Sequence, residues 1–178
     1  MVKDTLRKEM CKQRDALSKL AIETLSQKIT DNLILRPSFL QAKTIAIYLP
    51  KGTEVDTYRI IGAAIRMKKE VLVPVTDHKI TFYKFQSYED LLKGKFGILE
   101  PKTKIAPQYE PDLVIVPGLS FGLCMHRLGY GKGYYDKYLA TSRAHRIGIC
   151  YDFQIVEKLP SHENDQRMDE IITEKRVI

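Results

Sequence analysis

Residues 127–136 read RLGYGKGYYD, a stretch that combines three alternating glycines with two cations and three tyrosines. Glycine alternation lets a backbone turn sharply and lie close to a bound group, so successive N–H groups can converge on one anion. Phosphate is the anion that such a pattern favours. The stretch is not a P-loop, because no Ser or Thr follows Lys132, and it is not a dinucleotide fingerprint, because Tyr134 replaces its last glycine. The alternative is a flexible turn without a ligand. The secondary-structure elements on either side of the stretch must distinguish between a phosphate site and such a turn.

The overall composition indicates a soluble globular protein. The 178 residues are enough for one domain with a proper core, and we predict a single domain over residues 1–178. The chain has no run of about 18 apolar residues, and its first ten residues mix acids with bases. We therefore predict a cytoplasmic protein with no membrane partner.

The cysteines and histidines do not form a recognisable site. Cys11, Cys124 and Cys150 are widely separated and lack a C-x-x-C arrangement, and the four histidines lie in different segments. This pattern predicts reduced thiols and no histidine-based metal site.

A net charge of +7 indicates an acidic partner. The partner could be nucleic acid or a smaller polyanion such as a nucleotide or a polyglutamylated substrate, and the sign of the charge does not choose between them. A merely solubilising surface is the third explanation.

The elements that must position the glycine stretch begin with two helices in the first 35 residues. Apolar residues recur there at spacings of three and four, which predicts amphipathic helices. The two apolar stripes consist of Leu6, Met10 and Leu17, and of Ile22, Leu25, Ile29 and Leu33. Ser18 is the expected N-cap of the second helix, and Pro37 is expected to end the pair.

A strand and a helix are expected next, followed by two more strands. TIAIYLP (44–50) predicts a strand, and VDTYRIIGAAIRMKK (55–69) predicts a helix capped by Asp56, with Ile61, Ala64 and Ile65 on its inner face. EVLVPV (70–75) and KITFYKF (79–85) predict strands. The polar stretch from residue 94 to 107 is expected to lie outside the main sheet.

The glycine stretch itself lies between a strand and a helix. PDLVIVPG (111–118) predicts a strand buried on both faces, GYYDKYLATSR (133–143) a helix, and HRIGICYD (145–152) a further strand before a polar tail. Alternating strands and helices predict an α/β fold: one open, mostly parallel sheet with helices on both faces, a Rossmann-like three-layer arrangement with an N-terminal helical pair. Ligands of such sheets bind beyond the carboxyl ends of the strands, which favours a phosphate site at residues 127–136.

With these segments in view, the chain resembles the 5-formyltetrahydrofolate cyclo-ligases, also called 5,10-methenyltetrahydrofolate synthetases. Four segments carry the resemblance: VKDTLR, YLPKGTEVDT, VPGLSF leading to RLGYGKGYYDKYL, and PSHENDQRMDEII. The third is the most specific, because it is long and chemically unusual. The resemblance implies closure of 5-formyltetrahydrofolate to 5,10-methenyltetrahydrofolate with ATP and Mg²⁺ and release of ADP and phosphate.

The resemblance also implies roles for individual residues. The residues that would face ATP are Lys3, Arg7, Arg127, Leu128, Gly129, Tyr130, Gly131, Lys132, Gly133, Tyr134 and Tyr135. Those that would contact the folate are Leu49, Glu54, Tyr130, Gly131, Lys132, Gly133 and Tyr134. Lys132, Arg127 and Tyr134 are the catalytic candidates, the two cations because they can stabilise charge in the transition state.

Asp136 and Asp165 match the positions that bind Mg²⁺ in the family. Mg²⁺ prefers a few carboxylate oxygens together with water and phosphate, so two separated aspartates suffice. Without the resemblance, Lys132 and Asp136 would form an i, i+4 ion pair on a helix surface, and Lys3 and Arg7 would be a solvated helix stripe.

The chain departs from the family at two positions before Arg127. Many relatives have F-D-x-x-G-x-R-L-G, whereas this chain has Gly122 and Met125 in place of the Asp and the Gly. We expect this change to affect the turn, and with it the way Phe121 and Met125 meet the folate, but not the phosphate-binding groups.

Two other functions remain open on sequence grounds. Tyr130, Tyr134, Tyr135 and Tyr138 near basic residues could stack on RNA bases in a small RNA-binding module. Alternatively, the same fold and phosphate loop could serve a sugar phosphate. The cyclo-ligase hypothesis predicts a monomer that binds a folate, possibly polyglutamylated, and no nucleic acid.

Overall fold

The N-terminal helical pair is present. A computed structural model of the chain describes residues 2–94, 97–160 and 162–178. Helix α1 spans Val2–Asp15 and α2 spans Lys19–Ile34, and the Ser18 hydroxyl accepts a hydrogen bond from the Ala21 N–H, which confirms Ser18 as the N-cap. Pro37 does not simply end the pair, because it begins a short helix, α3 (Pro37–Gln41), where its missing N–H costs nothing.

A six-stranded sheet forms the centre of the molecule. Its order is β11-β9-β6-β1-β2-β3, and every neighbouring pair is parallel except the antiparallel pair β2 and β3. The strands are β1 (Thr44–Ile47), β2 (Glu70–Thr76), β3 (Ile80–Lys84), β6 (Leu113–Val116), β9 (His145–Ile149) and β11 (Glu170–Ile172). The predicted open, mostly parallel α/β sheet is thus confirmed. Strand β11 was not expected, because it lies in the polar C-terminal tail.

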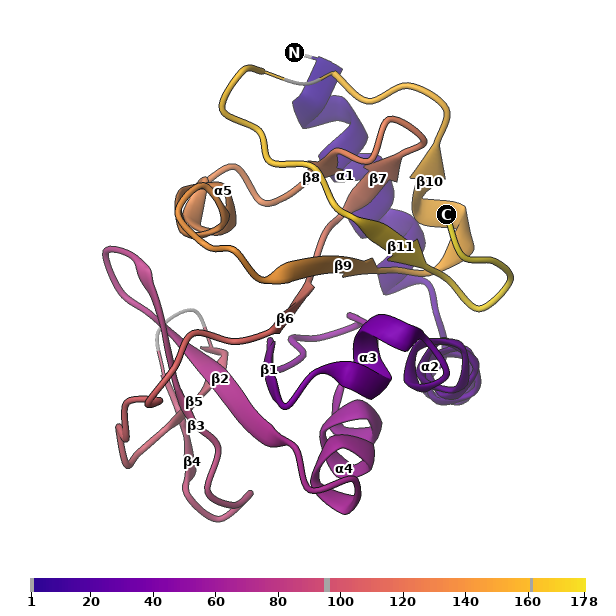
Figure 1. The fold of residues 1–178 in the computed structure, drawn as a ribbon. Coiled ribbons are helices and arrows are strands. Elements are labelled where there is room, and N and C mark those ends of the chain that lie inside the picture. The colour runs from indigo at the N-terminus through magenta and orange to yellow at the C-terminus, as the bar shows by residue number, and fades with distance from the viewer. Residues whose placement is uncertain (1, 95–96, 161) are drawn as a thin grey trace.

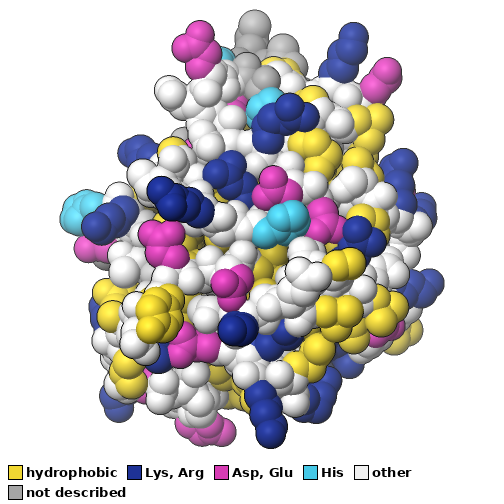
Figure 2. Space-filling model, viewed as in Figure 1, with side chains coloured by type: hydrophobic (Ala, Val, Ile, Leu, Met, Phe, Trp, Pro, Cys, Tyr) yellow, Lys and Arg dark blue, Asp and Glu magenta, His cyan; other side chains and the backbone are white. Residues whose placement is uncertain are grey.

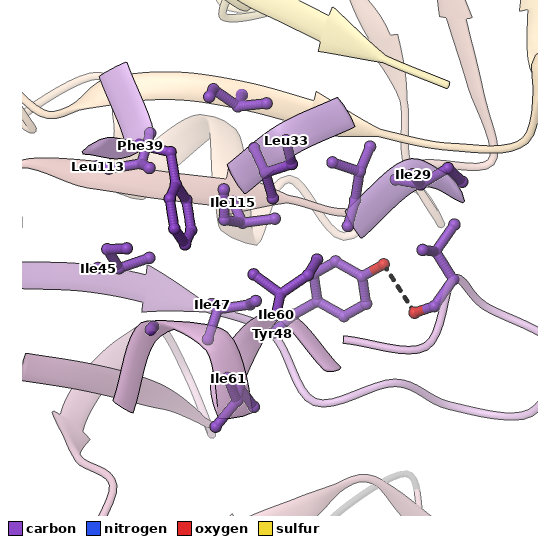
Figure 3. Close-up of a cluster of buried hydrophobic side chains, with 14 of the residues drawn as sticks. Ile29, Leu33, Phe39, Ile45, Ile47, Tyr48, Ile60, Ile61, Leu113 and Ile115 are labelled. Atoms are coloured by element: carbon purple, nitrogen blue, oxygen red, sulfur yellow. Dashed lines mark hydrogen bonds between the residues drawn. The ribbon is translucent and has the colours of Figure 1, made fainter. Parts of the chain in front are cut away.

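Alternate residues of the parallel strands enter two separate cores. Ile45 and Ile47 of β1 pack with α2, α3 and α4 (Tyr58–Arg66), as Figure 3 shows, whereas Ala46 faces the other core with α5 (Tyr134–Leu139). In Figure 1, α2, α3 and α4 accordingly lie on one side of the sheet and α5 on the other. Successive side chains of a strand point to opposite faces of the sheet, so one continuous apolar strand contributes to the core on both sides.

A second, smaller sheet supports the start of the glycine stretch. It has the order β10-β7-β8, with β7 (Ser120–Gly122), β8 (Arg127–Leu128) and β10 (Ile155–Val156), the last following a 3-10 turn, η2 (Asp152–Gln154). Helix α1 runs beside this sheet (Figure 1). The arrangement brings α1 next to residues 127–136.

The stretch from residue 94 to 107 lies outside the main sheet, as expected. It contributes β5 (Leu99–Pro101) to a two-stranded hairpin with β4 (Leu91–Lys93), and residues 95 and 96 fall outside the described part of the chain. Among the described residues, no helix has the length and apolar character needed to cross a bilayer. The three cysteines form no disulfide with one another in this structure.

One detail of α4 differs from the prediction. Thr57 occupies the N-cap position without a side-chain cap, and the Asp56 carboxylate accepts a hydrogen bond from the Tyr58 N–H at 2.9 Å, so Asp56 caps the helix as predicted. The predicted inner-face residues Ile61 and Ala64 are buried, whereas Ile65 is 47% exposed. Ile60, which is completely buried, takes the place of Ile65 on the inner face.

Candidate active site

A large cleft opens at the carboxyl ends of the central strands. Its volume is about 820 Å³, and its walls include Leu49 just after β1, Thr76 at the end of β2 and Gly118 just after β6. All of the candidate residues line it: Lys3, Arg7, Leu49, Glu54, Arg127, Leu128, Gly129, Tyr130, Gly131, Lys132, Gly133, Tyr134, Tyr135, Asp136 and Asp165. This is the edge at which ligands bind in open α/β sheets.

The glycine loop presents its backbone to the cleft. Gly131 and Gly133 have φ values of +92° and +66°, a left-handed conformation that glycine adopts without strain. Within the described part of the chain, the N–H groups of these two glycines donate to no backbone carbonyl. The loop leads into α5, which has only six residues and so adds little dipole to the site. The available anion-binding groups are therefore the loop amides and the neighbouring cations.

Two arginines lie against the loop where it lacks side chains. A Cβ at Gly129 would come within 2.8 Å of the Arg127 guanidinium, and one at Gly131 within 3.4 Å of the Arg7 guanidinium. The Arg7 Nε also donates to the Gly129 carbonyl oxygen at 2.9 Å. The glycines thus allow both guanidinium groups to approach the backbone closely.

Arg127 is a buried cation with unused hydrogen-bonding capacity. Its side chain is 4% exposed, with Nη2 3.1 Å from the Asp136 carboxylate and the guanidinium 5.4 Å from the centre of the Tyr135 ring. Among the described residues, its Nε and Nη2 have no aligned hydrogen-bond acceptor, and the buried Tyr135 hydroxyl has no partner either. Burial lowers the pKa of Arg127, while Asp136 opposes that shift. Buried donors without acceptors are the groups that an anionic ligand would satisfy.

Asp136 is paired with Arg127, which argues against an ion pair of Asp136 with Lys132 on a helix surface. Lys132 precedes the first residue of α5, so the two side chains do not share a helical face. Lys132 lines the cleft instead.

One face of α1 carries three cations toward the site. Lys3 donates to Asp165 at 3.0 Å, Arg7 contacts the glycine loop, and Arg14 donates to the Tyr130 hydroxyl at 2.7 Å. Arg14 was missed in the sequence, although its spacing of 11 from Lys3 and seven from Arg7 places it on the same helical face. The helical spacing of these three cations is the feature of the sequence from which Arg14 could have been predicted.

Glu54 and Tyr130 lie together on one side of the cleft. The Tyr130 hydroxyl donates to Glu54 Oε1 at 3.0 Å, and the Lys51 N–H donates to Glu54 Oε2 at 2.9 Å. Burial, with the Glu54 charge, raises the pKa of Tyr130 to about 12, so its hydroxyl stays protonated at neutral pH. Tyr130 is nevertheless 54% exposed, so it is not a core residue.

Asp136 and Asp165 are joined through a neighbouring residue. Asp136 Oδ1 accepts a hydrogen bond from the Gln166 N–H at 3.2 Å, which places the two aspartates on one wall of the cleft. Although burial opposes it, hydrogen bonds from the His162 N–H and Lys3 keep the pKa of Asp165 below its ordinary value. The described residues contain no group of three or more metal-ligating side chains. Two ionised carboxylates beside a phosphate-binding loop fit Mg²⁺, which retains waters and phosphate oxygens as ligands.

Another part of the cleft wall is apolar, and most of it was not anticipated. Besides Leu49, it includes Pro74, Ile80, Ile98 and Pro117. These residues come from four separate segments, so only the fold brings them together. A flat, partly apolar molecule would fit this wall, and a polyanion would fit the cationic one.

The departures from the family pattern lie beside the cleft. Met125 adopts φ +68°, a conformation suited to the glycine of the pattern, while a Cβ at Gly122 would lie 2.8 Å from Cys124 Sγ. Phe121 is completely buried against Gly118 and Gly148. Neither Phe121 nor Met125 is among the residues that line the cleft, so the expectation that they meet the folate is not supported.

Comparison with known proteins identifies the family of the chain. The profile of the 5-formyltetrahydrofolate cyclo-ligase family matches residues 1–174. The chain belongs to this family. A probable 5-formyltetrahydrofolate cyclo-ligase of Schizosaccharomyces pombe is 32% identical over 188 aligned positions, which cover 92% of each chain. The 5-formyltetrahydrofolate cyclo-ligase of Mycoplasma genitalium is 36% identical over 161 positions, or 87% of this chain and 88% of the other.

Solved structures of the family also share the fold. The 5,10-methenyltetrahydrofolate synthetase of Aquifex aeolicus superposes with a TM-score of 0.87 at 36% identity, covering 99% of this chain and 92% of the other. The synthetase of Mycoplasma pneumoniae gives a TM-score of 0.77 at 29% identity, covering 98% and 99%. The resemblance noted in the sequence is thereby confirmed, and the chain is a member of an enzyme family.

Proposed function

We propose that this chain converts 5-formyltetrahydrofolate to 5,10-methenyltetrahydrofolate and consumes one ATP per turnover. The formyl oxygen would take the γ-phosphoryl group of ATP, which releases ADP. N10 of the folate then attacks the activated formyl carbon and gives up its proton to solvent, and the C–O bond breaks as phosphate departs. Phosphorylation turns a poor leaving group into a good one, so one difficult dehydration becomes two easier steps.

The cationic wall of the cleft supplies the groups for the phosphoryl transfer. Lys132 and Arg127 are proposed to stabilise negative charge on the transferring phosphoryl oxygens, and the N–H groups of Gly131 and Gly133 to hold the phosphates. The unsatisfied N–H groups of buried Arg127 support this assignment. Tyr134, at the first position of α5, is proposed to orient the reacting groups.

The remaining nucleotide contacts are proposed for residues around the loop. Lys3 and Arg7 on α1 would bind phosphate oxygens, and Leu128, Gly129, Tyr130 and Tyr135 would contact the rest of the ATP. Asp136 and Asp165 would hold Mg²⁺, which neutralises phosphate charge when it is bound.

The folate is proposed to occupy the apolar wall. Glu54 would accept hydrogen bonds from the donor edge of the pterin, and Leu49 would pack on its face. The residues Gly131, Lys132, Gly133, Tyr130 and Tyr134 would then lie between the two substrates. In this arrangement the two reactants would lie side by side, which is the main requirement for a transfer between them.

The observation that carries the proposal is that a cation-rich glycine loop, the Glu54 carboxylate and a set of apolar side chains all line one cleft. The test is to mix the protein with ATP, Mg²⁺ and 5-formyltetrahydrofolate and follow the near-ultraviolet absorbance of the methenyl product. We expect the absorbance to rise, with one ADP formed per product. The proposal is rejected if neither product forms with ATP present.

The cytoplasmic location, the monomeric state and the acceptance of polyglutamylated folate are part of the proposal. Light scattering on the purified protein tests the oligomeric state, and turnover of folates with one and five glutamates tests the acceptance of polyglutamylated folate.

On the face shown in Figure 2, the Lys and Arg side chains of the described residues are interspersed with Asp and Glu, so that face offers no continuous basic band for RNA.

A further inference from the structure

Arg14 is a buried cation that reaches the folate side of the cleft from α1. The residue is 6% exposed, its Nη2 donates to the Tyr130 hydroxyl at 2.7 Å, and its Nη1 lies 3.8 Å from Glu54 Oε1. It is absent from the cleft lining, so it meets the ligand space only through these two partners. A buried arginine in this place is costly unless its partners compensate for the lost hydration.

The three side chains form a hydrogen-bond chain that runs in one direction. A guanidinium group can only donate, so the Tyr130 oxygen must accept from Arg14, and the Tyr130 hydroxyl proton is then directed to Glu54 Oε1. The other carboxylate oxygen is held by the Lys51 N–H. Arg14 therefore orients the Tyr130 hydroxyl and, together with the Lys51 N–H, helps to hold the Glu54 carboxylate.

Arg14 is itself anchored away from the cleft. Its Nε donates to Thr53 Oγ1 at 3.2 Å, and the Thr53 hydroxyl donates to Asp15 at 2.8 Å. The same helix holds the glycine loop through Arg7 and Gly129. The contacts of α1 thus reach the glycine loop at Gly129 through Arg7, and the Tyr130 hydroxyl and Glu54 through Arg14.

We infer that Arg14 is a positioning residue for folate binding, acting through Tyr130 and Glu54 rather than by touching the substrate. This inference rests on the proposed function, because it assigns the folate to the wall that holds Glu54. It predicts that loss of Arg14 weakens the folate complex and leaves the nucleotide complex nearly unchanged.

The test compares Arg14→Met with the matched control Thr53→Val. Arg14→Met leaves a buried carboxylate without its cation, and we expect the KM for 5-formyltetrahydrofolate and its calorimetric Kd without nucleotide to rise about tenfold or more. The KM for ATP should stay within about twofold, because the contacts of Lys3 and Arg7 remain. Thr53→Val removes the anchoring hydroxyl but keeps Tyr130 and Glu54 in contact with Arg14, and it should change the folate Kd less than about twofold.

A double-mutant cycle separates positioning from general damage to the fold. If Arg14 acts through the Tyr130 hydroxyl, the effects of Arg14→Met and Tyr130→Phe on the folate Kd are not additive. Arg14→Lys keeps a buried cation, so its affinity for folate should lie between that of Arg14→Met and that of the unmodified protein. This variant keeps the test available if Arg14→Met folds poorly. The inference is overturned if the Arg14 variants bind folate as the unmodified protein does, if the KM for ATP rises equally, or if the cycle is additive. Failure of the unmodified protein to form product would instead reject the proposed function.

Discussion

Lys3 and Asp165 form an ion pair with 3.0 Å between Nζ and Oδ2, although 162 positions separate them in the chain. The pair joins the first turn of α1 to the loop before β11 at the rim of the cleft. Lys3 is proposed to bind nucleotide and Asp165 to bind Mg²⁺, so each partner neutralises the other until MgATP provides both counter-charges. The pair thereby keeps Asp165 ionised and ready for the metal.

Asp165→Asn should therefore raise the Mg²⁺ concentration required for half-maximal turnover by about tenfold or more. The free energy of unfolding should fall by less than about 1 kcal/mol, because the pair is partly solvated. Turnover measured across an Mg²⁺ titration tests this. Glu163→Gln, the same change of charge at an exposed neighbouring residue, is the control, and an identical Mg²⁺ dependence in both variants would contradict the metal assignment.

Lys132→Met should lower kcat by about 100- to 1,000-fold, because it removes a cation that acts on developing phosphoryl charge. Stability should change by less than about 1 kcal/mol, since the residue is exposed. Single-turnover kinetics and urea unfolding measure the two effects. Lys137→Met on the exposed side of α5 is the matched control, and comparable turnover in both variants would remove Lys132 from the mechanism.

Glu170 couples the stability of the fold to pH. Its carboxylate accepts hydrogen bonds from Ser38 at 2.6 Å, Arg36 at 2.7 Å and His145 at 2.9 Å. Partial burial raises the pKa of Glu170, but these hydrogen bonds outweigh that effect and hold the pKa below its ordinary value. Because the pKa of Glu170 is lower in the folded state, the carboxylate contributes its full stabilisation above the pKa that it has in the unfolded chain. This stabilisation is lost as the pH falls through the lower pKa of the folded protein.

Glu170→Gln should consequently lower the free energy of unfolding by about 1–2 kcal/mol at pH 7. The difference from the unmodified protein should shrink as the pH falls below the ordinary glutamate pKa of about 4.3 and through the lowered pKa of folded Glu170. Urea unfolding at a series of pH values measures this. A difference that stays constant down to pH 3 would show that the charge of Glu170 does not contribute.

Met125→Gly should stabilise the protein slightly. Met125 has φ +68°, a conformation that costs a residue with a side chain about 1 kcal/mol relative to glycine. Met125 also packs against the second core, and losing that contact offsets part of the gain. We expect a net increase of about 0.5 kcal/mol in the free energy of unfolding, measured in urea.

Lys68→Gly provides a comparison without the packing contact. Lys68 follows α4 at φ +57°, and the Lys69 N–H donates to the Ala64 carbonyl oxygen, which is the glycine-favouring end of a helix. This exposed site should gain about 1 kcal/mol on substitution with glycine, more than Met125→Gly. Lys68→Ala keeps the strained Cβ and should gain nothing. Equal stability of the glycine and alanine variants would refute the strain argument.

Much of the fold could be predicted because its signals are local. The apolar spacings of α1 and α2, the Ser18 cap and the buried run of β6 each depend on residues within one element. Strand β11 was missed because its three residues lie in a polar tail, and only pairing with β9 makes them part of the sheet. Short strands carry too few residues for a periodic signal.

The candidate site shows the same division. Alternating glycines with interleaved cations indicated a phosphate loop from the sequence alone, and the family resemblance supplied Glu54, Asp136 and Asp165. Only the tertiary structure showed that Arg127 rather than Lys132 pairs with Asp136, and that Arg14 reaches Tyr130 across 116 positions. The physical reason is that secondary structure depends on neighbours a few residues away, whereas the partner of a charged side chain depends on how distant elements pack.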